Sequence, residues 1–359
     1  MKDGFLIGRV RLRFSKKRAG KIDPRDDLSA VAIDGDGTLW SASDELSALE
    51  RFRPDGAGTF SDHKTIGLAE AFQLPDPDET AEIDIEGLSH DDGVLWLTGS
   101  HTSTRRKPKG DEDMRDLERL TEVKFRPNRY VIGRLSPKKD GTPDKIARLP
   151  YTGSGNSLTD ALRDDPHLGP YLEALDPGSP SLQIPTKENG FDIEGLAVRN
   201  GHAFLGLRGP VFRGWASLFL EIEPKEAGNG QLDLKPIGNK GQLYRKHFVD
   251  LDGMGVRDLS FDGDDLLILS GPTMDLTGRQ SVWRLKDAAD LDDDSLTQSK
   301  DKRLKKLFDL PIVPDGDKAE GIERYDALGE PGLLVIYDAP QNARKPDERT
   351  VLGDVFRLA

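Results

Sequence analysis

Short apolar runs recur along the chain in pairs, and a turn rich in glycine and aspartate separates the two runs of each pair. This pattern is typical of β-hairpins and disfavours helix. Five segments share it, three of them closely. They are DLSAVAIDGDGTLWSAS (27–43), DIEGLSHDDGVLWLTGS (84–100), DIEGLAVRNGHAFLGLRGP (192–210), VRDLSFDGDDLLILSGP (256–272) and AEGIERYDALGEPGLLVIYDAP (319–340).

The spacing of these segments indicates a true repeat. Alignment places Glu194, Arg257 and Glu320 at one position, and each lies 63 residues from the next. Because typical propeller blades span about 40–50 residues, this interval predicts a four-stranded blade with enlarged loops. The interval of 108 residues from Glu86 to Glu194 corresponds either to one blade with large insertions, which we favour, or to two blades of which one is degenerate.

Further short apolar segments predict the outer strands of each blade. Residues 9–14 (RVRLRF) alternate arginine with apolar residues, as a strand with one buried face does. The fifth repeat lacks a fourth strand, so we predict that residues 9–14 pair with the last blade and close a ring. Third strands are expected at 48–52, 131–135, 218–222, 281–285 and 354–358, and fourth strands at 64–72, 145–151, 246–251 and 305–310.

The predicted fold is all-β, a single β-propeller over residues 1–359 with four-stranded blades. Five blades are favoured, with six as the alternative. Two segments break the repeat and predict surface insertions with short helical stretches, at about 103–128 and 155–190. We expect both to be solvated decorations rather than covers over a site.

Composition narrows the range of functions. The chain has 51 basic and 64 acidic residues and a formal charge of −13, which disfavours sequence-independent binding to nucleic acid or to an anionic membrane. It has no cysteine, which excludes disulfides, thiolate nucleophiles and cysteine metal sites. No segment has the apolar length of a membrane span, and we expect a monomeric, cytoplasmic bacterial protein.

Residues at the start of each first strand are expected to meet at one end of a propeller channel. Glu86, Glu194 and Glu320 occupy this position, with Arg257 and Ser29 as their equivalents in the other repeats. Neighbouring acids and a wider ring from the ends of the second strands complete the predicted rim. They are Asp84, Asp192 and Asp258, and then Asp44, His101, Arg208, Ser270 and Asp338.

So many carboxylates at one rim require a positive neighbour. In one hypothesis Arg208 and Arg257 pair with the glutamates and hold the blades in register. A second hypothesis is a Ca²⁺ site, because Ca²⁺ takes six to eight oxygen ligands. Its ligands would be Glu86, Glu194, Glu320, Asp84, Asp192 and Asp258. A third hypothesis is a metal-free face that binds a protein or glycan partner.

Other candidate residues follow from their positions. His101 is a candidate general base, since it alone of six histidines falls on the predicted rim. Arg208 and Arg257 are candidates to hold an anionic substrate group. Arg213, in LRGPVFRGWA (207–216), together with Asp44 and Asp338, is a candidate substrate contact.

One motif points to a different enzyme class. VAIDGDGTLW (31–40) matches the DxDGT signature of aspartate-nucleophile phosphatases. That chemistry needs a parallel α/β domain, whereas the other repeats have plain hairpin turns at this position. A structural turn is therefore favoured.

The run DIEGLAVRNGHAFLGLRGPVFRGWA (192–216) resembles the bacterial domain-of-unknown-function 3616 family, and the likeness extends over most of the chain. More distantly, the repeated DIEGL resembles phytase-like esterase propellers, and gluconolactonase-type propellers hold Ca²⁺ with channel carboxylates. The resemblance implies a Ca²⁺-dependent hydrolase of a phosphate ester or lactone, in which the cation polarises the substrate oxygen or activates water. The alternative is a non-enzymatic propeller that binds a protein or glycan.

Overall fold

The structure is a computed structural model that describes residues 4–15, 23–76, 82–110, 112–173, 184–314 and 316–358. Strands dominate these residues, so the chain is all-β, as predicted. No described helix is long and apolar enough to cross a bilayer. The helices are α1 (Asp113–Arg119), α2 (Ser157–Leu162), α3 (Gly169–Glu173) and the 3₁₀ helices η1 (Pro127–Tyr130), η2 (Thr186–Glu188), η3 (Ala288–Asp290) and η4 (Asn342–Arg344).

Five inner strands contact one another in a closed ring, which is the arrangement of a β-propeller. Each strand contacts the next, and the last contacts the first. All five begin one of the sequence repeats. In ring order they are β2 (Leu28–Ile33), β6 (Ile85–Asp91), β14 (Asp192–Arg199), β20 (Gly255–Asp262) and β25 (Lys318–Arg324).

Three further strands lie outward of each inner strand. The strand predicted at 64–72 ends at Gly67, because the next residues form a helical turn that buries Leu68 and Phe72. The other predicted outer strands are present. Outward of β2 lie β3 (Leu39–Ser43), β4 (Ala48–Pro54) and β5 (Thr59–Gly67), and outward of β6 lie β7 (Val94–Gly99), β10 (Ile132–Pro137) and β11 (Pro143–Arg148). Outward of β14 lie β15 (His202–Phe212), β16 (Ala216–Ile222) and β19 (Arg245–Asp250), and outward of β20 lie β21 (Asp265–Gly271), β22 (Ser281–Leu285) and β24 (Leu304–Asp309). Outward of β25 lie β26 (Gly332–Asp338), β27 (Thr350–Arg357) and β1 (Leu6–Arg13).

Strand β1 closes the ring, as its alternating pattern predicts. It pairs antiparallel with β27, with Arg9 opposite Asp354 and Arg13 opposite Thr350. It also pairs in parallel with β5 through Arg11 and Leu12, so the first and last units share one eight-stranded sheet.

Two other additions enlarge the sheets. The hairpin of β17 (Pro224–Gly228) and β18 (Gln231–Leu234) extends the sheet of β11, and β23 (Ser295–Thr297) pairs with β19. Hydrogen-bonded sheets therefore do not correspond one to one with the repeats.

The glycine of the DIEGL motif allows adjacent inner strands to approach closely. A Cβ atom at Gly87 would lie 2.9 Å from the backbone nitrogen of Leu196, and one at Gly195 would lie 3.0 Å from Cα of Asp258. A side chain at either position would separate the strands, so the motif is explained by packing between neighbouring units.

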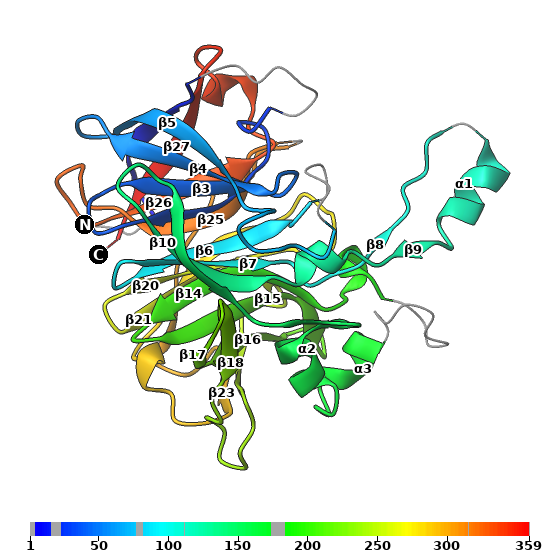
Figure 1. The fold of residues 1–359 in the computed structure, drawn as a ribbon. Coiled ribbons are helices and arrows are strands. Elements are labelled where there is room, and N and C mark those ends of the chain that lie inside the picture. The colour runs from blue at the N-terminus through cyan, green and yellow to red at the C-terminus, as the bar shows by residue number, and fades with distance from the viewer. Residues whose placement is uncertain are drawn as a thin grey trace.

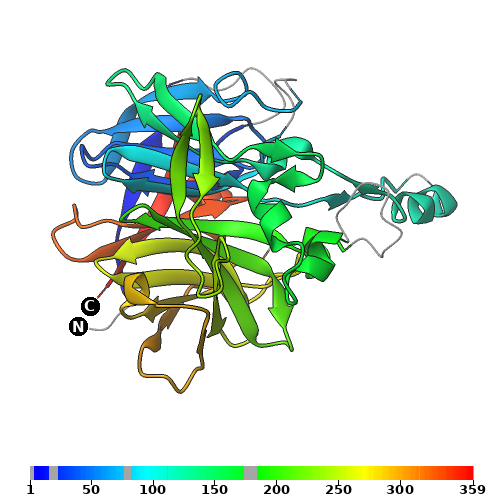
Figure 2. The ribbon, with the colours of Figure 1, turned by 60° about the horizontal axis from the view of Figure 1, so that its bottom comes forward.

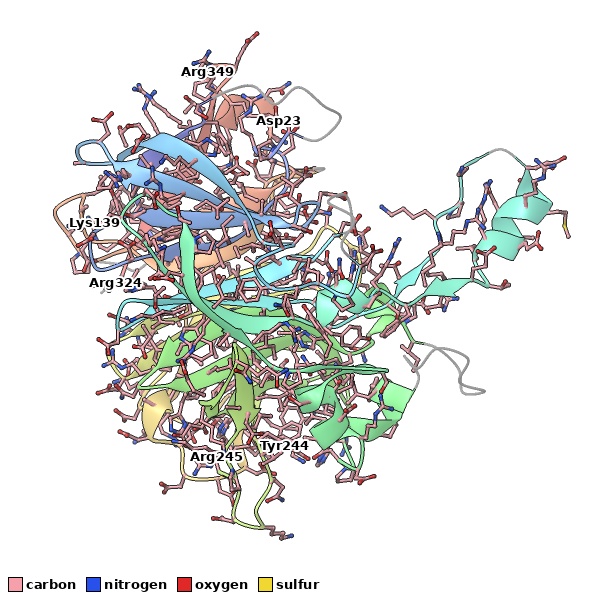
Figure 3. The ribbon with its side chains drawn as sticks, viewed as in Figure 1. Asp23, Lys139, Tyr244, Arg245, Arg324 and Arg349 are labelled. Atoms are coloured by element: carbon pink, nitrogen blue, oxygen red, sulfur yellow. The ribbon has the colours of Figure 1, made fainter. Side chains whose placement is uncertain are left out.

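The first insertion forms an arm that projects from the body (Figures 1 and 2). Strands β8 (Thr104–Arg105) and β9 (Val123–Lys124) form its base and α1 its tip. No residue of α1 is buried, and Figure 3 shows its side chains standing clear of the sheets. The tip of this segment is therefore exposed to solvent.

The second insertion packs on the body. After β12 (Tyr151–Thr152) and β13 (Gly155–Asn156), helix α2 begins at an Asn156 cap and buries Leu158 and Leu162 in the core. The prediction of a solvated decoration is wrong here, because its leucines continue the hydrophobic core. Residues 174–183 of this insertion lie outside the described residues.

The DxDGT-like segment is the turn between β2 and β3, as favoured from the repeats. Asp34 accepts hydrogen bonds from the backbone nitrogen of Thr38 at 2.9 Å and from Trp40 Nε1 at 3.0 Å. Its carboxylate therefore holds the turn.

Substitution in β1 tests the closing strand. Leu12 is fully buried, whereas Arg11 on the opposite face is exposed. Leu12→Ala should lower the free energy of unfolding by about 3 kcal/mol. Arg11→Ala should change it by less than about 0.5 kcal/mol. Urea unfolding measures both, and equal effects of the two changes would contradict the packing of β1.

Candidate functional site

A cavity of about 660 Å³ lies at the end of the ring where the inner strands begin. The ends of the second strands and the base of the 103–128 arm complete its lining. We use the word floor for ten charged residues of this lining, which are Asp44, Asp84, Glu86, Asp192, Glu194, Glu320 and Asp338 with Arg129, Arg208 and Arg257. Other charged residues also line the cavity, which are Glu45, Glu82, Glu188, Asp275 and Asp317 with Arg105, Arg106, Lys107, Lys124, Arg126, Lys187 and Lys318.

A β-bulge presents four of the floor side chains. In each first hairpin the pairing register shifts by one residue, which leaves one inner-strand residue without an opposite partner. Such bulges redirect a side chain and increase local twist. The bulge residues are Ser29, Glu86, Glu194, Arg257 and Glu320, the five positions aligned from the sequence.

Ser29 is the bulge residue that does not line the cavity. Its hydroxyl donates to the carbonyl oxygen of Ile85 at 2.5 Å and links the first two inner strands. The other four bulge residues line the cavity and bring one arginine among three glutamates.

Two arginines pair with two of these glutamates. Arg208 Nη1 donates to Glu194 Oε1 at 2.8 Å, and Arg257 Nη1 lies 2.9 Å from Glu194 Oε2. Arg257 Nη2 also donates to Glu320. Arg257 thus links β14, β20 and β25, in agreement with the predicted ion-pair network.

Arg129 forms a second pairing group that sequence reasoning missed. From η1 it contacts Asp84 at 2.6 Å and Glu82 at 2.7 Å. Ser100 donates a further hydrogen bond to Asp84. Arg129 follows the 103–128 insertion and has no counterpart in the repeat, so no sequence pattern marked it.

The remaining carboxyl groups have fewer protein partners. Glu86 has no hydrogen-bond or ion-pair partner in the described part of the chain. Neither carboxyl oxygen of Asp192 has a hydrogen-bond partner there, and Oδ1 of Asp44 also has none. Burial, reinforced by the neighbouring carboxylates, holds the pKa of Glu86 and Asp192 well above the usual range.

Two interacting carboxyl groups have pKa values that are pushed apart. Burial and then the charge of Glu320 raise the pKa of Asp44 to about 9. Burial raises the pKa of Glu320 to about 7, although the Arg257 charge opposes the increase. Near neutral pH the first group is therefore protonated while the second titrates.

Three predicted site residues do not line the cavity, which are Arg213, Asp258 and His101. Arg213 lies in an exposed turn. Asp258 accepts hydrogen bonds from the backbone nitrogens of Ile322 at 2.7 Å and Leu259 at 2.8 Å, so it connects β20 to β25.

His101 is a structural residue. It is fully buried, and its Nδ1 donates to the carbonyl oxygen of Gly99 at 2.7 Å. Its Nε2 lies 2.8 Å from Asn156 Nδ2 and accepts from that amide. Burial lowers the pKa of His101 to about 4, so the ring is neutral and both nitrogens are already occupied.

The predicted Ca²⁺ ligands do not fit a single site. Asp258 lies away from the cavity, while Glu194 and Glu320 face arginine. Within the described ranges, no group of three or more histidine or acidic side chains is arranged to hold a metal ion. The unpartnered oxygens of Asp192 and Asp44 come from the first residue of β14 and from the turn after β3.

Comparison with solved structures finds distant likenesses. A putative gluconolactonase is 13% identical with a TM-score of 0.39, covering 94% of this chain and 77% of its own. Virginiamycin B lyase from Staphylococcus aureus is 10% identical with a TM-score of 0.37, covering 98% and 99%. The PQQ-bound aldose sugar dehydrogenase from Streptomyces coelicolor is 12% identical with a TM-score of 0.38, covering 97% and 99%.

Comparison by sequence identifies the family. No curated protein sequence is significantly similar to the chain. A family model described as protein of unknown function (DUF3616) matches residues 27–354.

Substitution of the floor glutamates separates the paired from the unpaired carboxyl groups. Glu194→Gln breaks contacts with two arginines and should lower the free energy of unfolding at pH 7 by on the order of 3 kcal/mol. Glu86→Gln replaces a carboxyl group that has no ion pair among the residues the structure describes, and it should change the free energy of unfolding by less than about 1 kcal/mol. Urea unfolding at pH 7 provides the comparison, and a larger loss for Glu86→Gln would exclude the described pairing.

The raised pKa values also predict how stability depends on pH. Folding raises the pKa of Asp44 to about 9, that of Glu320 to about 7 and that of Glu323 to about 8. In the folded state these three groups therefore keep protons that the unfolded chain releases above about pH 4.5. Each group should therefore lower the free energy of unfolding by up to about 1.4 kcal/mol per pH unit from there to its folded pKa.

Urea unfolding at intervals between pH 4 and 8 should accordingly give greatest stability near pH 5. Burial alone would raise the pKa of Glu221, but hydrogen bonds from His202 and His247 lower it to about 2. Below about pH 4.5 the stabilising effect of Glu221 is therefore lost as its carboxylate is protonated. Glu323→Gln should flatten the decline, and the exposed control Glu118→Gln on α1 should not. Stability that rises from pH 5 to 8 would contradict the protonated state of these groups.

Proposed function

The chain belongs to the DUF3616 family, and we propose that it is a five-bladed propeller enzyme that hydrolyses a carboxylate ester or lactone in the floor cavity. The observation that carries this proposal is the pair of interacting carboxyl groups, Asp44 and Glu320, which line the cavity with separated pKa values. Environments that push two titratable groups apart are typical of acid and base catalysts.

The number of blades is supported by the ring of inner strands. Each of β2, β6, β14, β20 and β25 contacts its two neighbours and has three strands outward of it. The long interval between Glu86 and Glu194 contains β7, β10 and β11 together with the two insertions. This favours one enlarged blade there over two.

In the proposed reaction Glu320 is the general base. Its carboxylate takes a proton from water, and the water oxygen attacks the substrate carbonyl carbon to form a tetrahedral intermediate. Asp44 donates its proton to the leaving oxygen as the carbon–oxygen bond breaks. The products are a carboxylic acid and an alcohol, and the proton on Glu320 returns to Asp44 through solvent.

Arg257 acts as a positioning residue for the base. It contacts Glu320 and Glu194 together, so it holds the Glu320 carboxylate toward the cavity. Its charge also keeps the pKa of Glu320 below the value that burial alone would give.

The existing contacts of the floor arginines favour a carboxylate ester over a phosphate ester. All three guanidinium groups of the floor already contact carboxyl groups, namely Asp84, Glu194 and Glu320. None of the three is therefore left over to bind a phosphate dianion bidentately. The proposed reaction needs no step at a metal ion, and dependence on Ca²⁺ can be tested separately.

The pH dependence of hydrolysis tests the acid and base assignments. Activity requires ionised Glu320 and protonated Asp44, so kcat/KM should rise through about pH 7 and fall through about pH 9. The assay uses δ-gluconolactone, γ-butyrolactone and p-nitrophenyl acetate, with the spontaneous rate subtracted. Asp44→Asn and Glu320→Gln should each reduce kcat by about 10²–10⁴-fold.

Glu323→Gln is the matched control for that experiment. The pKa of Glu323 is raised to about 8, but its side chain does not line the cavity, so this variant should keep both limbs of the profile. Activity abolished by EDTA and restored by Ca²⁺ would instead support the metal-dependent hydrolase. Absence of hydrolysis in folded protein that binds a protein or glycan would support the non-enzymatic alternative.

A further inference from the structure

One side of the cavity opening is apolar and exposed. Met274, Leu276 and Ile312 line the cavity with exposures of 50%, 64% and 60%. They come from the loops after β21 and after β24, the second and fourth strands of one unit. Large apolar side chains left in water around a cavity are typical of a ligand-binding surface.

Asp192 lines the same cavity with a buried carboxyl group that lacks a hydrogen-bond partner in the described part of the chain. Its residue exposure is 1%, and neither carboxyl oxygen has a hydrogen-bond partner among the described residues. Arg208 Nη1 lies 3.9 Å from Oδ2, beyond hydrogen-bonding distance. That nitrogen donates to Glu194, and Nε of Arg208 donates to the carbonyl oxygen of Thr273.

These features together call for a hydrogen-bond donor from the ligand. A buried acceptor without a donor carries a large desolvation cost, which a cationic donor relieves most effectively. The protein's own guanidinium groups in the floor contact other carboxylates.

We propose that the substrate carries a primary ammonium group that donates to Asp192 and an apolar portion that lies on Met274, Leu276 and Ile312. This inference rests on the proposed function only in taking the floor cavity as the place where substrate binds. A primary ammonium group has three N–H donors on a compact head, whereas a quaternary ammonium group has none. The substrate class is therefore an amine-bearing ester or lactone with an apolar substituent.

Ammonium binding should displace a proton. The groups that act on the Asp192 carboxyl are Glu194 and Asp84, which favour its protonated form, and Arg208 and Arg257, which favour the carboxylate. A bound ammonium group adds one more positive charge and completes the ionisation. Calorimetry in two buffers of different ionisation enthalpy should show the release of up to one proton per ligand bound.

Isothermal titration calorimetry at pH 7 with four probes tests the ligand class. Hexylammonium should bind, while hexan-1-ol and hexyltrimethylammonium should bind at least tenfold more weakly. Ethylammonium should be weaker than hexylammonium, by up to about fourfold per methylene removed. Equal binding of hexan-1-ol or hexyltrimethylammonium, or no binding of hexylammonium, would overturn the proposal.

Two variants assign the groups that recognise the probe. Asp192→Asn should weaken hexylammonium at least tenfold, and unchanged affinity would overturn the role of Asp192. Leu276→Ser should reduce the preference for hexylammonium over ethylammonium several-fold. Leu276 is exposed, so this variant stays informative if Asp192→Asn does not fold.

Leu296→Ser is the matched control for Leu276→Ser, because Leu296 is also exposed, at 53%, but lies on β23 away from the cavity. It should leave both affinities unchanged, and equal losses in the two serine variants would overturn the apolar contact. Amine binding without hydrolysis of any ester would reject the proposed reaction and keep this ligand class. Hydrolysis of uncharged esters without amine binding would keep the proposed reaction and reject the ammonium ligand class.

Discussion

The bulge in the first hairpin of every unit is the constraint on which both fold and site depend. One inner-strand residue is released from cross-strand pairing, and the strand continues in register beyond it. In two units the next residue is a glycine whose missing side chain admits the neighbouring inner strand. Close packing of the ring and delivery of side chains to the cavity are thus two results of one local irregularity.

The electrostatics of the cavity follow from which residue each bulge carries. Arginine occurs once and contacts glutamates from both adjacent inner strands, while glutamate occurs three times. The arginines that enter from elsewhere do not balance all the acids. Burial then favours protons on the remaining carboxyl groups, and this allows one of them to act as an acid beside another that acts as a base.

Much of the architecture could be predicted because repetition makes position comparable along the chain. The alignment of Glu194, Arg257 and Glu320 identified the bulge positions, and the alternating pattern of β1 identified its partner. The site was harder to predict, since side-chain direction depends on local backbone geometry. His101 has a φ of +58° and is directed into contact with Asn156, and Asp258 follows a bulge and is directed toward β25. Arg129 has no repeated counterpart, so only the folded chain shows its role.

The position of β1 between β27 and β5 has a consequence for synthesis on the ribosome. The ion pair between Arg9 and Asp354 joins residues 345 positions apart. Strand β1 therefore cannot pair with β27 until the residues between the two strands have also been translated. During that time the outer edge of the first unit is open to pairing with other polypeptides.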